Sequence, residues 1–308
     1  MVTRRRAFII LVSAALLLLV STVSNLAAQG RTLTKDEERE AKAVAGALAS
    51  MAAGKPAVND LALAWVRTDA VQAQEDKNVV AFAMTLDSSK VPSGKVFVLW
   101  RVLPAGADPK DKKVAPLFEN FSTVALEGAA PFIGRLFLAP AGKVDVFIAA
   151  HELAEGKASK APVSVIKQTV DVPALKGGEF MFSSLFVFRS RKYPAPLADI
   201  MEHPYGTPEE ENLPLLNPTL SKSESLRVSG MLFNATGRVS VEYVAYKEGV
   251  ADPVKKWAAA EIDPAKQGIP DSVPLSDFAP GNYRLEITVT DKGSNKTLTE
   301  SLKFVVGS

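Results

Sequence analysis

The chain has 308 residues, of which 47% are hydrophobic and 23% are charged, so it is long enough for two folded domains and its composition excludes wholesale disorder. Its 36 Lys and Arg residues against 34 Asp and Glu residues give a net charge of +2, a balance that argues against nucleic acid as a partner. The absence of cysteine excludes disulfides, thiolate metal sites and a thiol nucleophile.

The first 30 residues have the pattern of a secretory signal peptide. Arg4–Arg6 form a positive segment, residues 7–20 form an apolar core, and residues 26–30 provide a small-residue exit, with cleavage after Ala28 or Gly30. We therefore expect an exported protein, periplasmic or extracellular, and the lack of cysteine favours a bacterial envelope. Two alternatives stay open: a twin-arginine export route, and an uncleaved N-terminal anchor that would be the chain's contact with the membrane.

Residues 31–58 are predicted to form an N-terminal helix and a linker. Thr34-Lys35-Asp36-Glu37 is a capping box, and apolar residues at helical spacing follow it, which predicts one helix over residues 35–53. Its apolar face is mostly alanine and buries little area. The helix is therefore expected to be a stalk, a helix docked on the first domain, or a marginal linker helix.

The first predicted domain, residues 59–175, is a run of short strands separated by Gly, Pro and Asp. Seven strands in roughly 110 residues is the number found in one β-sandwich. Lys95–Leu103 is apolar on both faces, as a central strand is, and Trp100 is a candidate core residue. The strands are expected near residues 61–68, 78–86, 95–103, 117–126, 131–138, 143–150 and 163–172.

The second predicted domain, residues 176–308, begins with a strongly aromatic strand. Phe180, Phe182, Phe186 and Phe188 are spaced to share one face, so both faces of the strand must be covered, either within the protein or by a partner chain. A long loop is expected over residues 189–224: five prolines between Pro194 and Pro214 favour an extended chain there, and the segment is longer than most structureless connections. Further strands are expected near residues 226–230, 239–246 and 257–262.

The C-terminus has the pattern of a β-hairpin. After the turn at Pro280-Gly281, Tyr283 begins a strict alternation of apolar and polar residues that resumes, after a polar loop at residues 291–295, up to Val306. This Pro-Gly-x-Tyr corner and final hairpin resemble the closing strands of immunoglobulin-like and fibronectin type III-like modules of exported bacterial proteins. The resemblance implies a tyrosine corner at Tyr283, and it implies a fold without carrying over any functional residue.

An internal similarity indicates two related domains in tandem. Residues 139–148, APAGKVDVFI, are similar to residues 279–287, APGNYRLEI, and each segment is followed by a polar loop and a closing strand. The first segment has Val144 where the second has Tyr283, so no tyrosine corner is expected there. The fold class predicted is therefore mainly β, with two tandem immunoglobulin-like β-sandwiches preceded by a signal peptide and one short α-helix.

The sequence contains few residues that suit catalysis. His151-Glu152 and His203 would have to converge with a further carboxylate to hold a metal, and no spacing motif joins them. Nucleophile-elbow, phosphate-loop, zinc-protease and dinucleotide motifs do not occur. No enzymatic activity, metal or cofactor is expected. Three tryptophans and two tyrosines could form a sugar-binding platform, although their place on alternating strands favours a role in the core; they are Trp65, Trp100, Trp257, Tyr243 and Tyr246.

The function predicted from these observations is a non-enzymatic, exported binding or scaffolding protein that makes protein–protein contacts in the cell envelope. Binding would use an exposed edge strand or the long loop. A carbohydrate-binding or adhesion module, and a pair of accessory domains of an envelope enzyme, are the alternatives. The candidate contact residues are the polar and aromatic side chains of the long loop together with one tryptophan: Tyr193, His203, Tyr205, Glu209, Glu210, Glu211 and Trp257.

Overall fold

The computed structural model describes most of the chain after residue 34 and shows a mainly β protein with one α-helix in the described part. Two compact units are present: the first unit contains the residues up to Ala174 and Asp199–Pro204, and the second unit contains Leu175–Ala198 and Tyr205–Ser308. The predicted signal peptide lies outside the described residues. These residues are 35–52, 55–108, 113–126, 132–153, 162–193, 203–206, 210–216, 218–266, 268–269 and 272–307.

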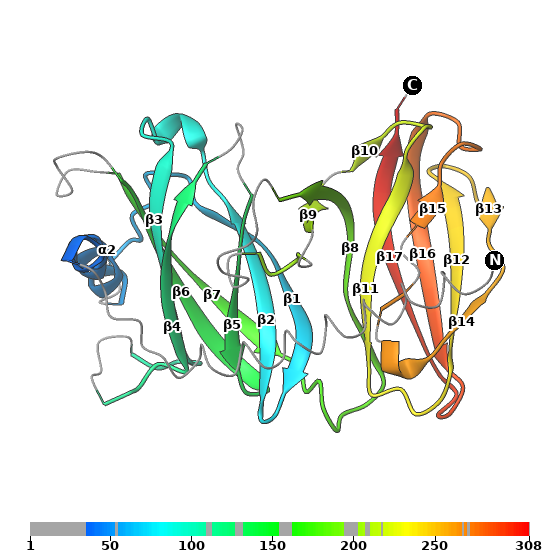
Figure 1. The fold of residues 1–308 in the computed structure, drawn as a ribbon, viewed down its shortest axis with the longest axis horizontal. Helices are drawn as coiled ribbons and strands as arrows, with labels where there is room; N and C mark the ends of the chain where they lie inside the picture. Colours follow the sequence, from blue (N-terminus) through cyan, green and yellow to red (C-terminus); the bar gives the residue numbers. More distant parts are fainter. Residues whose placement is uncertain are drawn as a thin grey trace, which may run out of the picture. The chain divides into compact units, whose positions relative to one another are not determined.

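The first unit consists of two antiparallel sheets that enclose one hydrophobic core (Figure 1). One sheet has the strand order β1-β2-β5 and the other has the order β4-β3-β6-β7. All seven expected strands are present, and the first begins three residues later than predicted because residues 59–62 form a turn. The elements are β1 (Ala64–Gln74), β2 (Lys77–Thr85), the 3-10 turn η1 (Ser88–Lys90), β3 (Lys95–Pro104), β4 (Phe118–Ala125), β5 (Phe132–Ala139), β6 (Gly142–Glu152) and β7 (Val163–Val172).

Trp100 lies at the centre of this core, as its strand pattern predicted. It is 1% exposed, and its indole Nε1 donates a hydrogen bond of 3.1 Å to the carbonyl of Leu136 on the opposite sheet. Phe82 packs against it edge to face with ring centroids 6.2 Å apart. The indole therefore joins the two sheets by packing and by satisfying its one polar atom.

The helix α2 (Lys35–Ala52) covers the outer face of the four-stranded sheet. Val44 and Leu48 of the helix pack with Phe97 on β3 and Phe147 on β6, all of them buried. The two-sided apolar pattern of β3 explains this arrangement, because a strand that is apolar on both faces must be covered on both. Of the three expectations for the helix, the structure supports docking on the first unit.

The second unit also has two sheets around one core (Figure 1). The smaller sheet has the order β15-β11-β8-β9, and the larger has the order β10-β17-β16-β12-β13, with β14 also paired to β12. The elements are β8 (Met181–Lys192), β9 (Glu210–Leu215), β10 (Thr219–Leu220), β11 (Ser225–Phe233), β12 (Val239–Lys247), β13 (Lys255–Lys256), β14 (Ala260–Ile262), the 3-10 turn η4 (Pro264–Lys266), β15 (Ser272–Pro274), β16 (Gly281–Asp291) and β17 (Lys296–Val306).

The sequence predicts a loop over residues 189–224, and this prediction is wrong wherever the structure describes a strand in that range. The strand β8 continues to Lys192 and pairs antiparallel with β9, and β10 pairs in parallel with the end of β17. Cross-strand charge pairing explains part of the difference: Arg191 Nη2 lies 2.8 Å from Glu211 Oε2. Pro214 is compatible with β9 because that strand forms the edge of its sheet.

The phenylalanines of β8 do not all share one face, contrary to the alternation. Ser184 has a φ of 60°, and the pairing of β8 with β11 shifts register between Ser229 and Met231, which is a β-bulge. Phe182 therefore packs in the core between the sheets. Phe186 turns to the other face, where its ring lies 5.3 Å from that of Tyr205. The strand is thus covered on both faces within the second unit.

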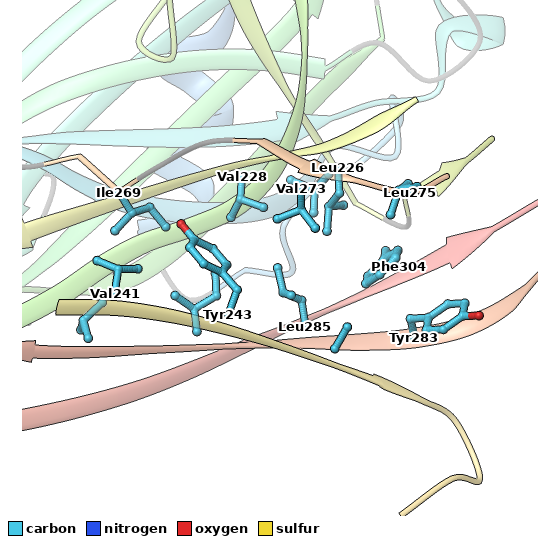
Figure 2. Close-up of a cluster of buried hydrophobic side chains, with 14 of the residues drawn as sticks. Leu226, Val228, Val241, Tyr243, Ile269, Val273, Leu275, Tyr283, Leu285 and Phe304 are labelled. Atoms are coloured by element: carbon cyan, nitrogen blue, oxygen red, sulfur yellow. The ribbon is translucent and has the colours of Figure 1, made fainter. Parts of the chain in front are cut away.

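The core of the second unit follows the alternation read from the sequence (Figure 2). Leu285, Ile287 and Val289 of β16 are fully buried. Tyr283 forms the predicted tyrosine corner: its hydroxyl donates a 2.6 Å hydrogen bond to the carbonyl of Ala279. The polar end of a buried ring is thereby satisfied by the turn that precedes the strand.

The two similar sequence segments occupy corresponding places in the two units. The strand β6 lies between β3 and β7, and β16 lies between β12 and β17. Each begins with a glycine at positive φ, 118° for Gly142 and 149° for Gly281, a conformation that glycine adopts at little cost. The extra residue of the first segment lies before this glycine, so the strands themselves align.

Candidate functional site

Four of the predicted contact residues lie on or beside the β8–β9 hairpin of the second unit. Glu210 and Glu211 belong to β9, Gly206, next to Tyr205, bridges Glu211, and Tyr193 follows β8. Burial, reinforced by the charge of Glu211, raises the pKa of Tyr193 to about 12, so its phenol stays protonated. The buried ring of Tyr205 supports Phe186. These side chains mainly stabilise the hairpin.

The structure does not place the other three predicted contact residues in that group. His203 is assigned to the first unit, and Glu209 lies outside the described residues. Trp257 is half-buried beside the larger sheet of the second unit, where its ring stacks on that of Phe278 at 6.1 Å. The seven residues therefore do not form one site among the residues that the structure describes.

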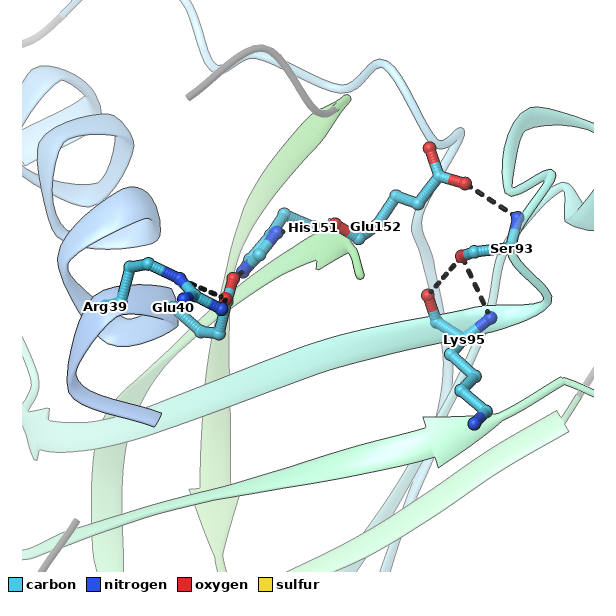
Figure 3. Close-up of polar contacts among 6 residues, drawn as sticks. All are labelled: Arg39, Glu40, Ser93, Lys95, His151 and Glu152. Atoms are coloured by element: carbon cyan, nitrogen blue, oxygen red, sulfur yellow. Dashed lines mark hydrogen bonds and ion pairs between the residues drawn. The ribbon is translucent and has the colours of Figure 1, made fainter. Parts of the chain in front are cut away.

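His151, the other histidine, is fully buried under the helix α2 (Figure 3). Its Nδ1 lies 2.8 Å from the carbonyl oxygen of Glu152, so that nitrogen must carry a hydrogen. Its Nε2 lies 2.9 Å from Oε2 of Glu40 on the helix, and this contact is a hydrogen bond only if a proton lies between the two atoms. Burial lowers the pKa of His151, opposed by the Glu152 carbonyl and the Glu40 charge.

These contacts attach the helix to the sheet and do not suit a metal. Glu152, the neighbour of His151, points to a loop, where it accepts a 2.8 Å hydrogen bond from the backbone N–H of Ser93 (Figure 3). Among the residues that the structure describes, no group of three or more His, Asp and Glu side chains is placed to hold a metal ion. Within the described part of the chain, no helix is both long and apolar enough to cross a membrane.

A groove of about 680 Å³ lies on the outer face of the larger sheet of the second unit. Its floor is a row of side chains on adjacent strands, because Arg284 on β16 pairs with both Tyr246 on β12 and Lys303 on β17. One wall is the turn after β12, with the exposed Val250, and the other is Pro218 and Thr219 beside β17. We call this hollow the sheet groove; it is lined by Pro218, Thr219, Tyr246, Lys247, Glu248, Gly249, Val250, Ala251, Asn282, Tyr283, Arg284, Lys303, Phe304 and Val305.

The sheet groove carries an excess of positive charge. Three basic side chains line it, Lys247, Arg284 and Lys303, against one acid, Glu248, which accepts a 2.7 Å hydrogen bond from Asn282. The Arg284 guanidinium lies 4.5 Å above the Tyr246 ring and 2.6 Å from Glu286, so it is held in one place. Lys303 is exposed and makes no ion pair within the described part of the chain.

Arg284 and Lys303 face each other in an unfavourable pairing. Glu248 N–H donates to the Asn282 carbonyl, so the backbone groups of even-numbered β16 residues point toward β12. Arg284 and Lys303 are therefore a non-hydrogen-bonded pair of β16 and β17. In such pairs the side chains lie closest, and like charges destabilise the sheet; here the carboxylate of Glu286, 2.6 Å from Arg284, offsets part of that repulsion. An anion in the sheet groove would relieve this repulsion.

Sequence reasoning missed the sheet groove, although a usable signal exists in the hairpin. The charged residues on its floor, Arg284 and Lys303, are ordinary polar positions on alternating strands, and such positions normally form just a solvated face. Continuing the hairpin register from the loop at residues 291–295 would have placed Arg284 opposite Lys303. The turn that walls the groove, residues 248–251, carries no such signal. The sequence matches no family model and no curated protein.

Proposed function

We propose that this is a non-enzymatic, exported protein that binds a partner protein in the cell envelope or outside the cell, and that the sheet groove is its contact site. The observation that carries the proposal is the pairing of two cations, Arg284 and Lys303, in a hollow with apolar walls. Proteins keep such destabilising pairs where they serve binding. The signal-peptide pattern of residues 1–30 supports export.

The strand order supports immunoglobulin-like modules as the scaffold. With the strands of the first unit lettered A, B, C, C′, E, F and G in chain order, its sheets are ABE and C′CFG. Immunoglobulin constant domains have the sheets ABED and CFG, so the two arrangements differ in one edge strand. In the second unit, β8, β11 and β15 correspond to A, B and E, and β12, β16 and β17 correspond to C, F and G. The tyrosine corner at Tyr283 also fits.

The chemistry of the sheet groove favours binding over catalysis. Its cations are a lysine and an arginine that is fixed by stacking on Tyr246, an arrangement suited to holding a carboxylate. A reaction would further require a nucleophile with an adjacent base. The lining contains hydroxyl groups and lysines but no histidine, and its one carboxylate, Glu248, is engaged by Asn282.

Site-specific photo-cross-linking in intact cells tests the proposed contact site. A photoreactive amino acid would replace Val250 on the rim of the groove, and Val58 of the first unit is a matched control, because the two side chains are 48% and 44% exposed. We expect one protein adduct from position 250, lost in a Lys303→Glu background, and none from position 58. Equal labelling at both positions, or a glycan adduct at 250, would contradict the proposal, and the glycan would favour the carbohydrate-binding alternative.

Export is tested separately by sequencing the N-terminus of the mature protein. Cleavage after Ala28 or Gly30 would leave Gln29 or Arg31 as the first residue. An intact Met1 on protein from the soluble cell interior would overturn the export proposal without affecting the groove.

A further inference from the structure

We propose that the second unit binds an extended peptide segment of its partner as an additional strand on the free edge of β17, with a carboxylate of that segment held by Lys303 and Arg284. This inference rests on the proposed function and specifies its partner chemistry. It joins two independent features: the direction of the backbone groups of β17 and the charge of the sheet groove.

The first feature is a row of backbone groups that point away from the sheet. The N–H groups of Val305 and Gly307 donate to Pro218 and Leu220, on the outer side of β17. Because these groups alternate along a strand, those of the odd-numbered residues before Val305 point to the same side. Within the described residues, β10 pairs only with Val305 and Val306. Among the described residues, the outward backbone groups of Thr297, Thr299, Ser301 and Lys303 therefore have no hydrogen-bond partner, while β8 of the smaller sheet passes close to β17.

This edge is unusually regular. The strands β16 and β17 pair over eleven consecutive residue pairs without a register shift, so no bulge twists the edge away. Of the other outer strands, β1 has two register shifts, β9 contains Pro214, and β7 exchanges backbone hydrogen bonds with Val58 and Asp60. The outer strands β4 and β5 are also regular, but each pairs over only eight residues. An open, flat edge of this kind is suited to strand addition.

The second feature sets the sequence that the added strand should have. In an antiparallel addition, the residue opposite Lys303 places its side chain on the same face, at the edge of the sheet groove, where an acid would pair with the lysine. The half-buried Leu298 and Leu302 favour apolar partners, and the exposed Glu300 favours a base. Read along the added strand, the preferred pattern is acidic, apolar, any, basic, any, apolar.

A peptide accounts for both features, whereas an anionic glycan accounts for one. A sulfated or carboxylated sugar could pair with Lys303 and Arg284, but it lacks the regular series of N–H and C=O groups that the edge of β17 would satisfy. The two ligands therefore differ in what they protect. Only the peptide should slow hydrogen exchange at the odd-numbered amides of β17.

The test uses amide hydrogen exchange of the full-length protein with the synthetic peptide Glu-Val-Thr-Lys-Thr-Val-Thr. We expect the amides of Thr297, Thr299, Ser301 and Lys303 to exchange at least tenfold more slowly with saturating peptide, while the even-numbered amides, already bonded to β16, change little. Lys303→Glu should weaken binding at least tenfold, and a peptide with Lys in place of its first Glu should restore it. Lys143→Glu on the first unit is the control and should have no effect.

Three results would overturn the inference. The first is equal protection of the odd-numbered and even-numbered amides of β17. The second is equal binding of a peptide whose Glu is replaced by Ala. The third is an anionic glycan that displaces the peptide and leaves the odd-numbered amides of β17 unprotected. If Val250 still cross-links to a protein partner in cells while these peptides fail, strand addition is wrong and the proposed function stands. If Val250 captures no protein, the proposed function fails first.

Discussion

The two units share a strand order but treat the outer face of the corresponding sheet in opposite ways. In the first unit, Phe97 and Phe147 make that face apolar, and the helix α2 covers it. In the second unit, the same face is polar, with hydroxyl pairs such as Thr288 and Thr299, and it remains open as the sheet groove. One architecture can therefore present either a covered or an open face, according to the alternate residues along its strands that point to that face.

The largest expected effect comes from removing an aromatic ring beneath the helix. Phe147→Ala should cost about 3–5 kcal/mol in unfolding free energy of the first unit, because the ring is 3% exposed and its loss leaves a cavity. Thr288→Ala, on the corresponding strand and face of the second unit, should cost less than about 1 kcal/mol. Urea unfolding followed by hydrogen-exchange mass spectrometry measures both units in one sample. Equal costs would mean that the two faces are equally buried.

The next effect concerns a buried carboxylate of the second unit. Asp291 accepts hydrogen bonds from Thr236, Gly237 and Ser294, so Asp291→Ala should cost about 2–3 kcal/mol. Burial alone would raise the pKa of Asp291, but hydrogen bonds from Ser294 and Thr236 outweigh it and lower that pKa. The ionised form is therefore favoured by folding.

The stability due to Asp291 depends on pH with a definite sign. It is fully present above the unfolded pKa of about 3.9 and is lost as the pH falls toward the lower folded value. The difference in unfolding free energy between the wild type and Asp291→Asn should shrink as the pH falls below about 4. A difference that grows on acidification would contradict this assignment, and the first unit serves as the internal control.

The attachment of the helix α2 provides a third prediction. In Glu40→Gln, the side-chain amide can donate an N–H to Nε2 of His151, so the contact no longer needs a proton on that nitrogen. The helix should therefore stay docked even at high pH. Glu40→Ala leaves the buried imidazole nitrogen without its partner and should cost about 1–2 kcal/mol. Proteolysis within residues 35–52 measures the undocking. Equal cleavage of the two variants would show that the contact with His151 contributes nothing to docking.

The tyrosine corner gives a smaller effect. Tyr283→Phe removes one hydrogen bond to Ala279 and should cost the second unit about 1 kcal/mol. Val144 occupies the corresponding position in the first unit and makes no such bond, so Val144→Ala serves as a packing control there. If Tyr283→Phe leaves the unfolding free energy of the second unit unchanged, the tyrosine corner is not needed for stability.

The smallest expected effect is a gain in stability rather than a loss. Lys303→Glu replaces the like-charge pairing with Arg284 by an attractive one and should stabilise the free second unit by up to about 1 kcal/mol. The gain should decrease at high salt because the pair is exposed. Thermal unfolding at two salt concentrations measures it. A destabilised variant would mean that Lys303 has a structural role, and its place in the sheet groove would need another explanation.

Much of the fold follows from local sequence patterns. The alternation after Pro280-Gly281 correctly predicted the buried row of β16, and the two-sided apolar run of β3 predicted a covered strand. The hydrogen bond of the Tyr283 hydroxyl was implied by the resemblance of the Pro-Gly-x-Tyr corner. The pattern failed at β8, because the bulge at Ser184 reverses the direction of Phe186. It also failed at β9, whose pairing depends on contacts with β8 rather than on its own composition.

The candidate site was less predictable than the fold. A groove requires residues from strands and turns that are distant in the sequence, and each of them is ordinary by itself. The predicted contact residues were polar and aromatic side chains of the expected long loop, but Tyr205 is buried against Phe186, and Glu211 pairs with Arg191. Composition does not distinguish a solvated acid from a cross-strand partner. Only the register of paired strands does.

Hydroxyl-radical footprinting of the full-length protein tests the contrast between the two outer faces most directly. Tyr246 and Val250 of the sheet groove should be oxidised readily, whereas Phe97 and Phe147 beneath the helix should be protected until the helix is removed by cleavage. If Phe97 or Phe147 reacts as fast as Tyr246 in the intact protein, the account is contradicted.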